Sequence, residues 1–200
     1  MNVSRFVFNP FGENTYILWD DSTKEAAIVD PGMSSAAEND AVDKFIAEKG
    51  LKLTHLVNTH MHIDHAIGNG HIMEKYGLVC ECNETDNYLA ERLTAQAQMF
   101  GIPFHGKNIA VGKHLADNSE INVGDEKFQV LYVPGHTKGH IALYSATSSF
   151  VLTGDALFQM SIGRTDLPGG NFNELINSIE QRLFKLPPET IVYPGHGGET

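Results

Sequence analysis

Residues 58–69, "NTHMHIDHAIGN", follow an apolar, β-branched run and are the most informative part of this sequence. Four side chains that can bind a metal ion fall within six residues of this stretch: His60, His62, Asp64 and His65. Four such groups are hard to explain as packing, because each one, once buried, needs a polar partner of its own. A metal ion would satisfy them together, so the stretch predicts a metal centre.

Single residues of the same type recur directly after other apolar runs, namely His136 and His140 in "VLYVPGHTKGH", Asp155 in "FVLTGDALF" and His196 in "IVYPGH". Strand ends are rigid, so residues placed there can converge on one edge of a pair of sheets. Positions i and i+2 of an extended segment share a face, so His60 and His62 can bind one ion together. Asp64 and His65 stand where the chain turns into a helix and point elsewhere, as a second ion would require.

Apolar runs bounded by turn residues predict strands at 4–9, 15–20, 25–32, 53–60, 78–82, 127–136, 139–146, 149–158 and 190–198. Helical spacing predicts helices at 34–50, 64–77, 84–101 and 172–186, and residues 102–120 are predicted as a long loop. This order fits two packed sheets with helices outside, a four-layer αββα sandwich of the α/β class. With 200 residues we expect one domain over 1–200.

Charge and composition argue against some classes of binding partner. The net charge of -11 argues against nucleic acid, which needs a basic face. The sequence has no apolar run of 18 residues and no signal-peptide stretch, so we expect no membrane partner and a cytoplasmic location. Cys80 and Cys82 would point to opposite faces of a strand, so we expect structural thiols and no mutual disulfide.

The motifs quoted above, together with "NPFGENTY" at 9–16 and "GRTD" at 163–166, resemble the metallo-β-lactamase superfamily, and within it the glyoxalase II-like hydrolases. The resemblance covers nearly the whole chain. It implies the ligands of two metal ions: His60, His62 and His136 for the first, Asp64, His65 and His196 for the second, and Asp155 bridging both. Asp64 and Asp155 would be the catalytic carboxylates.

The sequence predicts the roles of the remaining polar residues less specifically. His140 is expected to support a ligand, and Arg164 with Asp166 either braces the metal loop or forms a surface salt bridge. Four other histidines are expected to be structural or superficial: His55, His71, His105 and His114. The loop 103–117, which carries Lys107 and Lys113, is the expected docking place for a carboxylate on the substrate.

The resemblance also has limits. Zinc β-lactamases differ at the position of Asp155, so antibiotic hydrolysis is not expected. Glyoxalase II carries a C-terminal helical region with glutathione contacts. This chain stops four residues after His196, so glutathione specificity is not implied and the natural protein can extend past Thr200.

The predicted function is hydrolysis of a small acyl thioester at two metal ions. Two ions lower the pKa of a shared water from about 15.7 to about 7. A thiolate, with a conjugate acid of pKa about 8.5, then leaves without a general acid. Zn²⁺ is the first choice of metal, and Fe or Mn remains open because the ligands include no thiolate. Two alternatives are a persulfide dioxygenase with one iron on two His and one Asp, and a non-enzymatic binding protein. The oligomeric state is not predicted.

Overall fold

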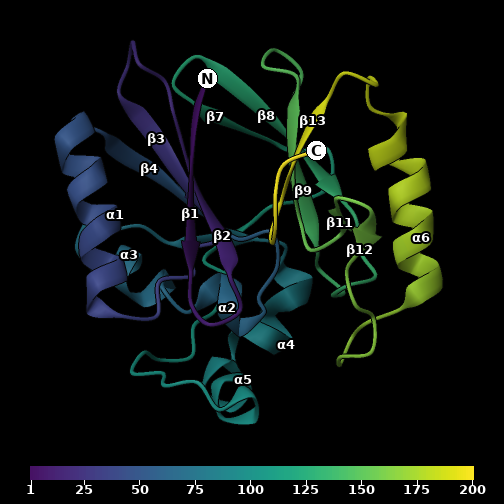
Figure 1. The fold of residues 1–200 in the computed structure, drawn as a ribbon, viewed down its shortest axis with the longest axis horizontal. Helices are drawn as coiled ribbons and strands as arrows, with labels where there is room; N and C mark the ends of the chain where they lie inside the picture. Colours follow the sequence, from purple (N-terminus) through teal and green to yellow (C-terminus); the bar gives the residue numbers. More distant parts are fainter.

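The computed structural model describes residues 1–200. Two main sheets pack face to face, with α1 (Ala36–Lys49) on the outer side of one and α6 (Phe172–Gln181) on the outer side of the other (Figure 1). This arrangement confirms the predicted four-layer αββα sandwich. None of its helices has the length and apolar character needed to cross a membrane.

The first sheet has six strands in sequence order: β1 (Asn2–Phe8), β2 (Glu13–Trp19), β3 (Glu25–Val29), β4 (Lys52–Val57), β5 (Cys80–Cys82) and β6 (Lys113–His114). β1, β2 and β3 pair antiparallel, whereas β3, β4, β5 and β6 pair parallel. The parallel strands therefore all end at one edge of the sheet, and the loops that leave that edge include residues 58–62.

The second sheet has five strands in the order β13 (Ile191–Pro194), β10 (Phe150–Gly154), β9 (Ile141–Ser145), β8 (Glu126–Tyr132) and β7 (Glu120–Val123). β10 and β13 pair parallel and the other neighbours antiparallel. Strands β8, β10 and β13 therefore run in one direction and deliver their following loops to one edge. A small hairpin of β11 (Leu157–Phe158) and β12 (Ser161–Ile162) follows β10.

Three apolar clusters join the layers. Between the sheets, fully buried Leu18 and Phe128 belong to one continuous core. On the outside of the first sheet, α1 (Ala36–Lys49) buries Val42 and Ile46. On the outside of the second sheet, α6 (Phe172–Gln181) buries Leu175 and Ile179, and the short η2 (Leu183–Lys185) follows it.

The ends of α1 follow directly from local sequence. Ser35 caps the helix by accepting a hydrogen bond from the Glu38 N–H, and Glu38 returns a bond to the Ser35 N–H, which completes a capping box. Gly50 ends the helix in the left-handed region at φ 64°. The predicted helix at 34–50 is confirmed.

The predicted helix at 64–77 is wrong in one respect, because it divides into α2 (Ile63–Ala66) and α3 (Asn69–Tyr76). The division falls at Gly68, whose N–H donates to the Pro31 carbonyl at 2.8 Å. A Cβ at position 68 would lie only 2.7 Å from that oxygen, so the close approach requires glycine.

The predicted helix at 84–101 is also divided, into η1 (Glu84–Asp86), α4 (Asn87–Ala90) and α5 (Leu93–Phe100). The carbonyls at the division have other partners: Ala90 accepts from the Ile109 N–H at 3.1 Å, and Leu89 accepts from Gln96 Nε2 at 3.0 Å. The predicted loop 102–120 contains β6 and the first residue of β7. Both strands are too short, at 2 and 4 residues, to give a clear pattern.

Candidate metal centre

Strand ends carry the predicted ligands to one place. β4 ends at Val57 and leads to residues 60–65, and β8 ends at Tyr132 and leads to His136. β10 ends at Gly154, directly before Asp155, and β13 ends two residues before His196. The loops of both sheets therefore meet at one edge of the sandwich.

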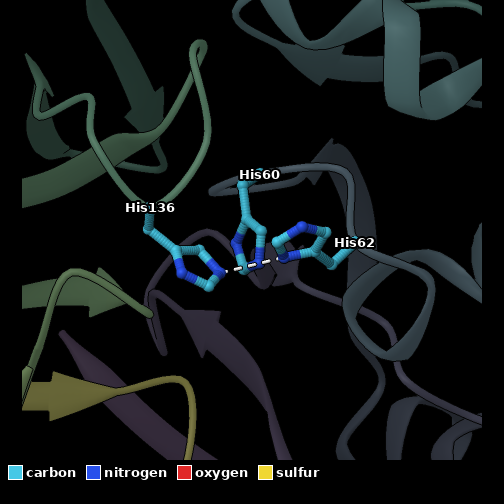
Figure 2. A group of neighbouring side chains, drawn as sticks. All are labelled: His60, His62 and His136. Atoms are coloured by element: carbon cyan, nitrogen blue, oxygen red, sulfur yellow. Dashed lines mark hydrogen bonds between the residues drawn. The ribbon is translucent and has the colours of Figure 1, made fainter. Parts of the chain in front are cut away.

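The first group of donors is His60, His62 and His136, whose side chains point toward one another from two loops (Figure 2). Their candidate ligand atoms all lie within 4.8 Å of one another. His62 Nδ1 and His136 Nε2 are 2.9 Å apart, and the His60 ring stands nearly perpendicular to both. All three side chains are buried.

The second group is Asp64, His65 and His196. The Nε2 atoms of His65 and His196 lie 3.2 Å apart, and Asp64 Oδ2 lies 3.3 Å from His196 Nε2. His65 is fully buried, whereas Asp64 and His196 remain partly accessible. The two groups together contain six of the seven predicted ligands.

Asp155 lies between the two groups. Its Oδ1 is 3.3 Å from His65 Nε2, and its Oδ2 is 3.7 Å from His136 Nε2 and 3.5 Å from His196 Nε2. One carboxylate therefore faces donors of both groups. The approach leaves no room at Gly195, where a Cβ would collide with the Asp155 carboxylate.

The donor set fits metal ions. His60 Nε2 and Asp155 Oδ1 are buried and have no hydrogen-bond partner, which is rare for buried polar atoms. Both atoms point into the space that the other donors share, where a cation would satisfy them. Asp30 with His60 and His65 forms a third group within 4.8 Å, but hydrogen bonds to Thr59 already occupy its carboxylate. We therefore treat Asp30 as a support.

The electrostatics favour the metal-binding protonation states in the first group of donors but not throughout the second. Burial, reinforced by neighbouring imidazoles, holds the pKa of His60 well below its ordinary value and lowers the pKa of His62 to about 3. Burial raises the pKa of Asp155, but the imidazole of His65 outweighs it and the net pKa is lowered. Neutral imidazoles and ionised carboxylates are the metal-binding forms.

The histidines of the second group differ in this respect. Burial lowers the pKa of His65 and of His196, but the carboxylates of Asp64 and Asp155 outweigh it and raise both pKa values. A metal ion therefore has to displace a proton there.

Asp30 is a functional residue that the sequence interpretation missed. It accepts hydrogen bonds from the Thr59 N–H at 2.7 Å and the Thr59 hydroxyl at 2.6 Å, and its Oδ2 lies 3.1 Å from His65 Nδ1. The Thr59 oxygen in turn lies 3.1 Å from His60 Nδ1. These bonds fix the tautomers of both histidines so that each Nε2 is free. The signal was present, since Asp30 directly follows the apolar strand β3.

Further contacts hold the other donors. His140 Nε2 accepts the N–H of Asp155 at 3.1 Å, so His140 supports Asp155, as expected. His136 Nδ1 donates to the Arg164 carbonyl at 2.7 Å. The side chains of Arg164 and Asp166 form a two-bond ion pair at 56% and 67% exposure. The high exposure favours the second interpretation, a surface salt bridge, for these side chains. The backbone carbonyl of Arg164 is the group that contacts His136.

Two more residues, Asp86 and Gln96, hold the loops that carry the histidines. The sequence did not predict this role for either residue. Asp86 accepts bonds from the Met61 N–H, the Thr137 hydroxyl and the Gly139 N–H. Burial raises the pKa of Asp86 to about 6, although these bonds act the other way. Gln96 donates to the Met61 carbonyl at 3.1 Å. No local pattern in the sequence distinguishes these two residues from polar residues on a helix surface.

Five of the seven donors line a cavity of about 200 Å³, whereas His60 and His65 lie behind them and are fully buried. The walls of the cavity are Phe11, His62, Asp64, Phe100, His136, Asp155, Arg164, Leu167 and His196. A larger cavity of about 950 Å³ lies elsewhere, between the start of α1, α3 and residues 103–109, and contains none of the donors. Because chemistry needs the donors, the smaller cavity is the candidate site.

The expectation that the loop 103–117 docks a carboxylate of the substrate does not agree with the structure. Lys107 lines the larger cavity, and Lys113 pairs with Glu81 at 2.6 Å, so neither cation faces the donors. Arg164 is the cation that lines the candidate site.

The other histidines and the cysteines have structural contacts. His55 pairs with Glu81 at 2.6 Å, His71 with Asp43 at 3.0 Å, and His114 accepts the Glu84 N–H. His105 lines the larger cavity. Both cysteines are buried free thiols, and burial raises the pKa of Cys80 to about 12.

Known proteins share this sequence pattern. The family model described as metallo-beta-lactamase superfamily matches residues 8–196. Hydroxyacylglutathione hydrolase GloC of Haemophilus influenzae is 35% identical over 201 residues, which cover 100% of this chain and 92% of the relative. Human mitochondrial persulfide dioxygenase ETHE1 is 32% identical over 182 residues, 91% of this chain and 63% of the relative.

Solved structures share the fold. The BLEG-1 B3 metallo-beta-lactamase superposes with a TM-score of 0.89 at 28% identity, covering 100% of this chain and 93% of that one. TTHA1623, solved in a di-iron-bound form, gives a TM-score of 0.85 at 32% identity, covering 98% and 93%.

Proposed function

This chain belongs to the metallo-beta-lactamase superfamily of metal-dependent enzymes, and we propose that it hydrolyses small acyl thioesters at a pair of metal ions. The observation that carries the proposal is the position of Asp155, whose carboxylate faces donors of both groups. The name of the related hydroxyacylglutathione hydrolase supports the same class of reaction.

In this proposal His60, His62 and His136 would hold the first ion, and Asp64, His65 and His196 the second. Asp155 would be shared between the two. When bound, the ions would supply a nucleophilic water at neutral pH and a Lewis acid for the carbonyl of the substrate. Zn²⁺ is the proposed metal, because imidazole and carboxylate ligands suit it, while Fe and Mn remain chemically possible with the same ligands.

The protein's own residues keep the donors in place. Asp30 and Thr59 orient His60 and His65, and the Arg164 carbonyl orients His136. His140 fixes the backbone of Asp155. Because these contacts are preformed, the donors need little rearrangement when metal binds.

A thioester suits a site without a general acid. A leaving thiol has a pKa of about 8.5, so it departs as the thiolate near neutral pH. None of the residues that line the cavity, apart from the donors, can act as a general acid. Phe11, Phe100 and Leu167 are apolar, and Arg164 stays protonated. An amide, whose leaving group needs a proton, suits this cavity less well.

A second candidate function is iron-dependent oxidation of a persulfide. The supporting observation is the 32% identity to the human persulfide dioxygenase. That chemistry needs one iron on two histidines and one aspartate, and it consumes oxygen.

One preparation can separate the two functions. Protein purified without chelator is analysed for metals, then given S-lactoylglutathione, the acetyl thioester of N-acetylcysteamine, and glutathione persulfide with oxygen uptake followed. We expect about two ions per chain, thioester cleavage and no oxygen uptake. Oxygen uptake with persulfide, with no thioester cleaved, assigns the dioxygenase function instead.

We also propose that residues 1–200 form one domain and that the protein acts in the cytoplasm. The continuous core between the sheets supports the first proposal. The two free thiols are in keeping with a reducing compartment.

A further inference from the structure

An aromatic pair forms one wall of the candidate site. The rings of Phe11 and Phe100 meet edge to face, with centroids 5.7 Å apart and an interplanar angle of 81°. Phe11 lies in the loop between β1 and β2, and Phe100 is the last residue of α5. Both line the cavity of the donors, yet neither ring contributes to ion binding, and Phe11 remains 41% exposed.

The two flanks of the cavity differ in chemistry. The Phe11 carbonyl lies 3.2 Å from His196 Nδ1, which places the aromatic wall beside the second group of donors. The Arg164 carbonyl accepts from His136 Nδ1, which places Arg164 beside the first group. The aromatic flank is therefore apolar, while the Arg164 flank is charged and open to solvent.

We propose that the Phe11–Phe100 wall binds the acyl part of the substrate, and that this acyl part is a short, apolar chain. The inference rests on the proposed thioester hydrolysis and names its substrate class. The polar thiol carrier lies on the other flank. There Arg164 uses Nε and Nη2 for Asp166, so its Nη1 is available to the carrier.

The chemistry of the wall agrees with an apolar acyl group. Phe11 and Phe100 both line the cavity and present only ring carbon atoms to it. An alkyl chain gains contact with the faces and edges of these two phenyl rings.

The size of the cavity limits the chain length. Its volume is about 200 Å³, and a cavity of about 150 Å³ holds a six-carbon benzene molecule. The ions and part of the thiol carrier would share this cavity, so the space beside the wall holds an acyl chain of at most about six carbons, and further methylenes extend into solvent. Each methylene that is buried should improve kcat/KM by about fourfold.

The first test is a series of acetyl, butanoyl, hexanoyl and octanoyl thioesters of N-acetylcysteamine. For the metal-loaded protein we expect kcat/KM to rise by on the order of tenfold from butanoyl to hexanoyl and to level off at octanoyl. The rise should appear in KM, because the chain contacts the wall equally before and during reaction. A flat series overturns the inference and leaves thioester hydrolysis standing.

Variants then locate the effect. Phe11→Ala should lower the hexanoyl-to-acetyl ratio of kcat/KM by about tenfold, and Phe11→Leu should restore most of it, since leucine keeps apolar area. Phe184, exposed at 65% on η2 and outside the cavity, is the matched control. Phe184→Ala should keep the ratio of the unchanged protein. An unaltered ratio in Phe11→Ala overturns the proposed wall.

A binding measurement separates this inference from the proposed reaction. Calorimetric titration of the metal-loaded protein with acetate and hexanoate needs no turnover. Hexanoate should bind on the order of tenfold or more tightly than acetate, with the gain lost in Phe11→Ala. If no thioester is cleaved but this difference is found, the reaction is wrong and the apolar wall stands. Equal binding of the two acids overturns the wall.

Discussion

Asp86 and Thr137 are joined by a hydrogen bond of 2.7 Å although 51 residues separate them in the chain. The same buried carboxylate accepts the Met61 N–H at 3.2 Å and the Gly139 N–H at 2.6 Å. Met61 stands between His60 and His62, and Thr137 follows His136. One side chain therefore fixes the distance between the two loops that carry the first group of donors.

Replacing Asp86 should affect both stability and metal binding. Asp86→Ala leaves three buried donors without an acceptor, and we expect a loss of about 3 kcal/mol in the free energy of unfolding. Urea unfolding of the metal-free protein measures this loss, and a metal titration should show weaker binding of the first ion. Glu84→Ala, on the exposed side of the same turn, should change neither quantity. Unaltered metal affinity in a destabilised Asp86→Ala would limit Asp86 to a packing role.

Asp155→Asn tests the bridging position. The change is nearly isosteric, so far-UV circular dichroism of the metal-free protein should be unchanged. An amide is a poor ligand compared with a carboxylate, so we expect the second ion to be lost and kcat/KM to fall by about 10³-fold or more. Two retained ions with full turnover would contradict the bridging role.

Asp30→Asn tests the support behind the histidines. An amide nitrogen would face the Thr59 hydroxyl and His65 Nδ1, where the carboxylate now accepts. Loss of such a support costs about 10- to 100-fold in metal affinity. Competition with a chelator of known affinity measures the change. Equal affinity in the variant would show that the surrounding loops alone hold His60 and His65.

The strands and α1 could be predicted because their signals are local. Ser35 and Gly50 mark the ends of α1, and the apolar runs of β8 and β10 show directly in the sequence. The seven candidate donors could be placed together for a related reason: each lies in a segment that follows a strand, and strand ends meet at one edge. Their number and residue types indicated metal binding. Their division between two ions, which the family resemblance implied, stays a prediction.

The divided helices could not be predicted because their causes are distant. Gly68 contacts Pro31, and Ala90 accepts a hydrogen bond from Ile109. Asp86 is similar, since its three partners lie at least 25 residues away. A pattern read along the chain contains no information about which loop will lie against a given carbonyl or carboxylate.

Asp43 should determine part of the acid stability of the protein. On α1, its carboxylate accepts from Lys75 Nζ at 2.6 Å and the Tyr76 hydroxyl at 2.7 Å, both on α3. Burial raises the pKa of Asp43, but the bonds to Lys75 and Tyr76, with His71, outweigh it and lower the pKa. A lowered pKa in the folded state means that the contribution is complete above the unfolded pKa of about 4 and is lost as the pH falls through the folded value.

The Asp43→Asn variant isolates that contribution. At pH 7 we expect it to unfold with about 2 kcal/mol less free energy than the unchanged protein, because charged hydrogen bonds are replaced by neutral ones. The difference should shrink as the pH is lowered below about 4, where the carboxylate of the unchanged protein becomes protonated. Urea unfolding of metal-free protein at several pH values measures it, and the exposed Asp40→Asn on the same helix is the control. A difference that is the same at pH 7 and pH 3 would mean that the charge of Asp43 is not its source.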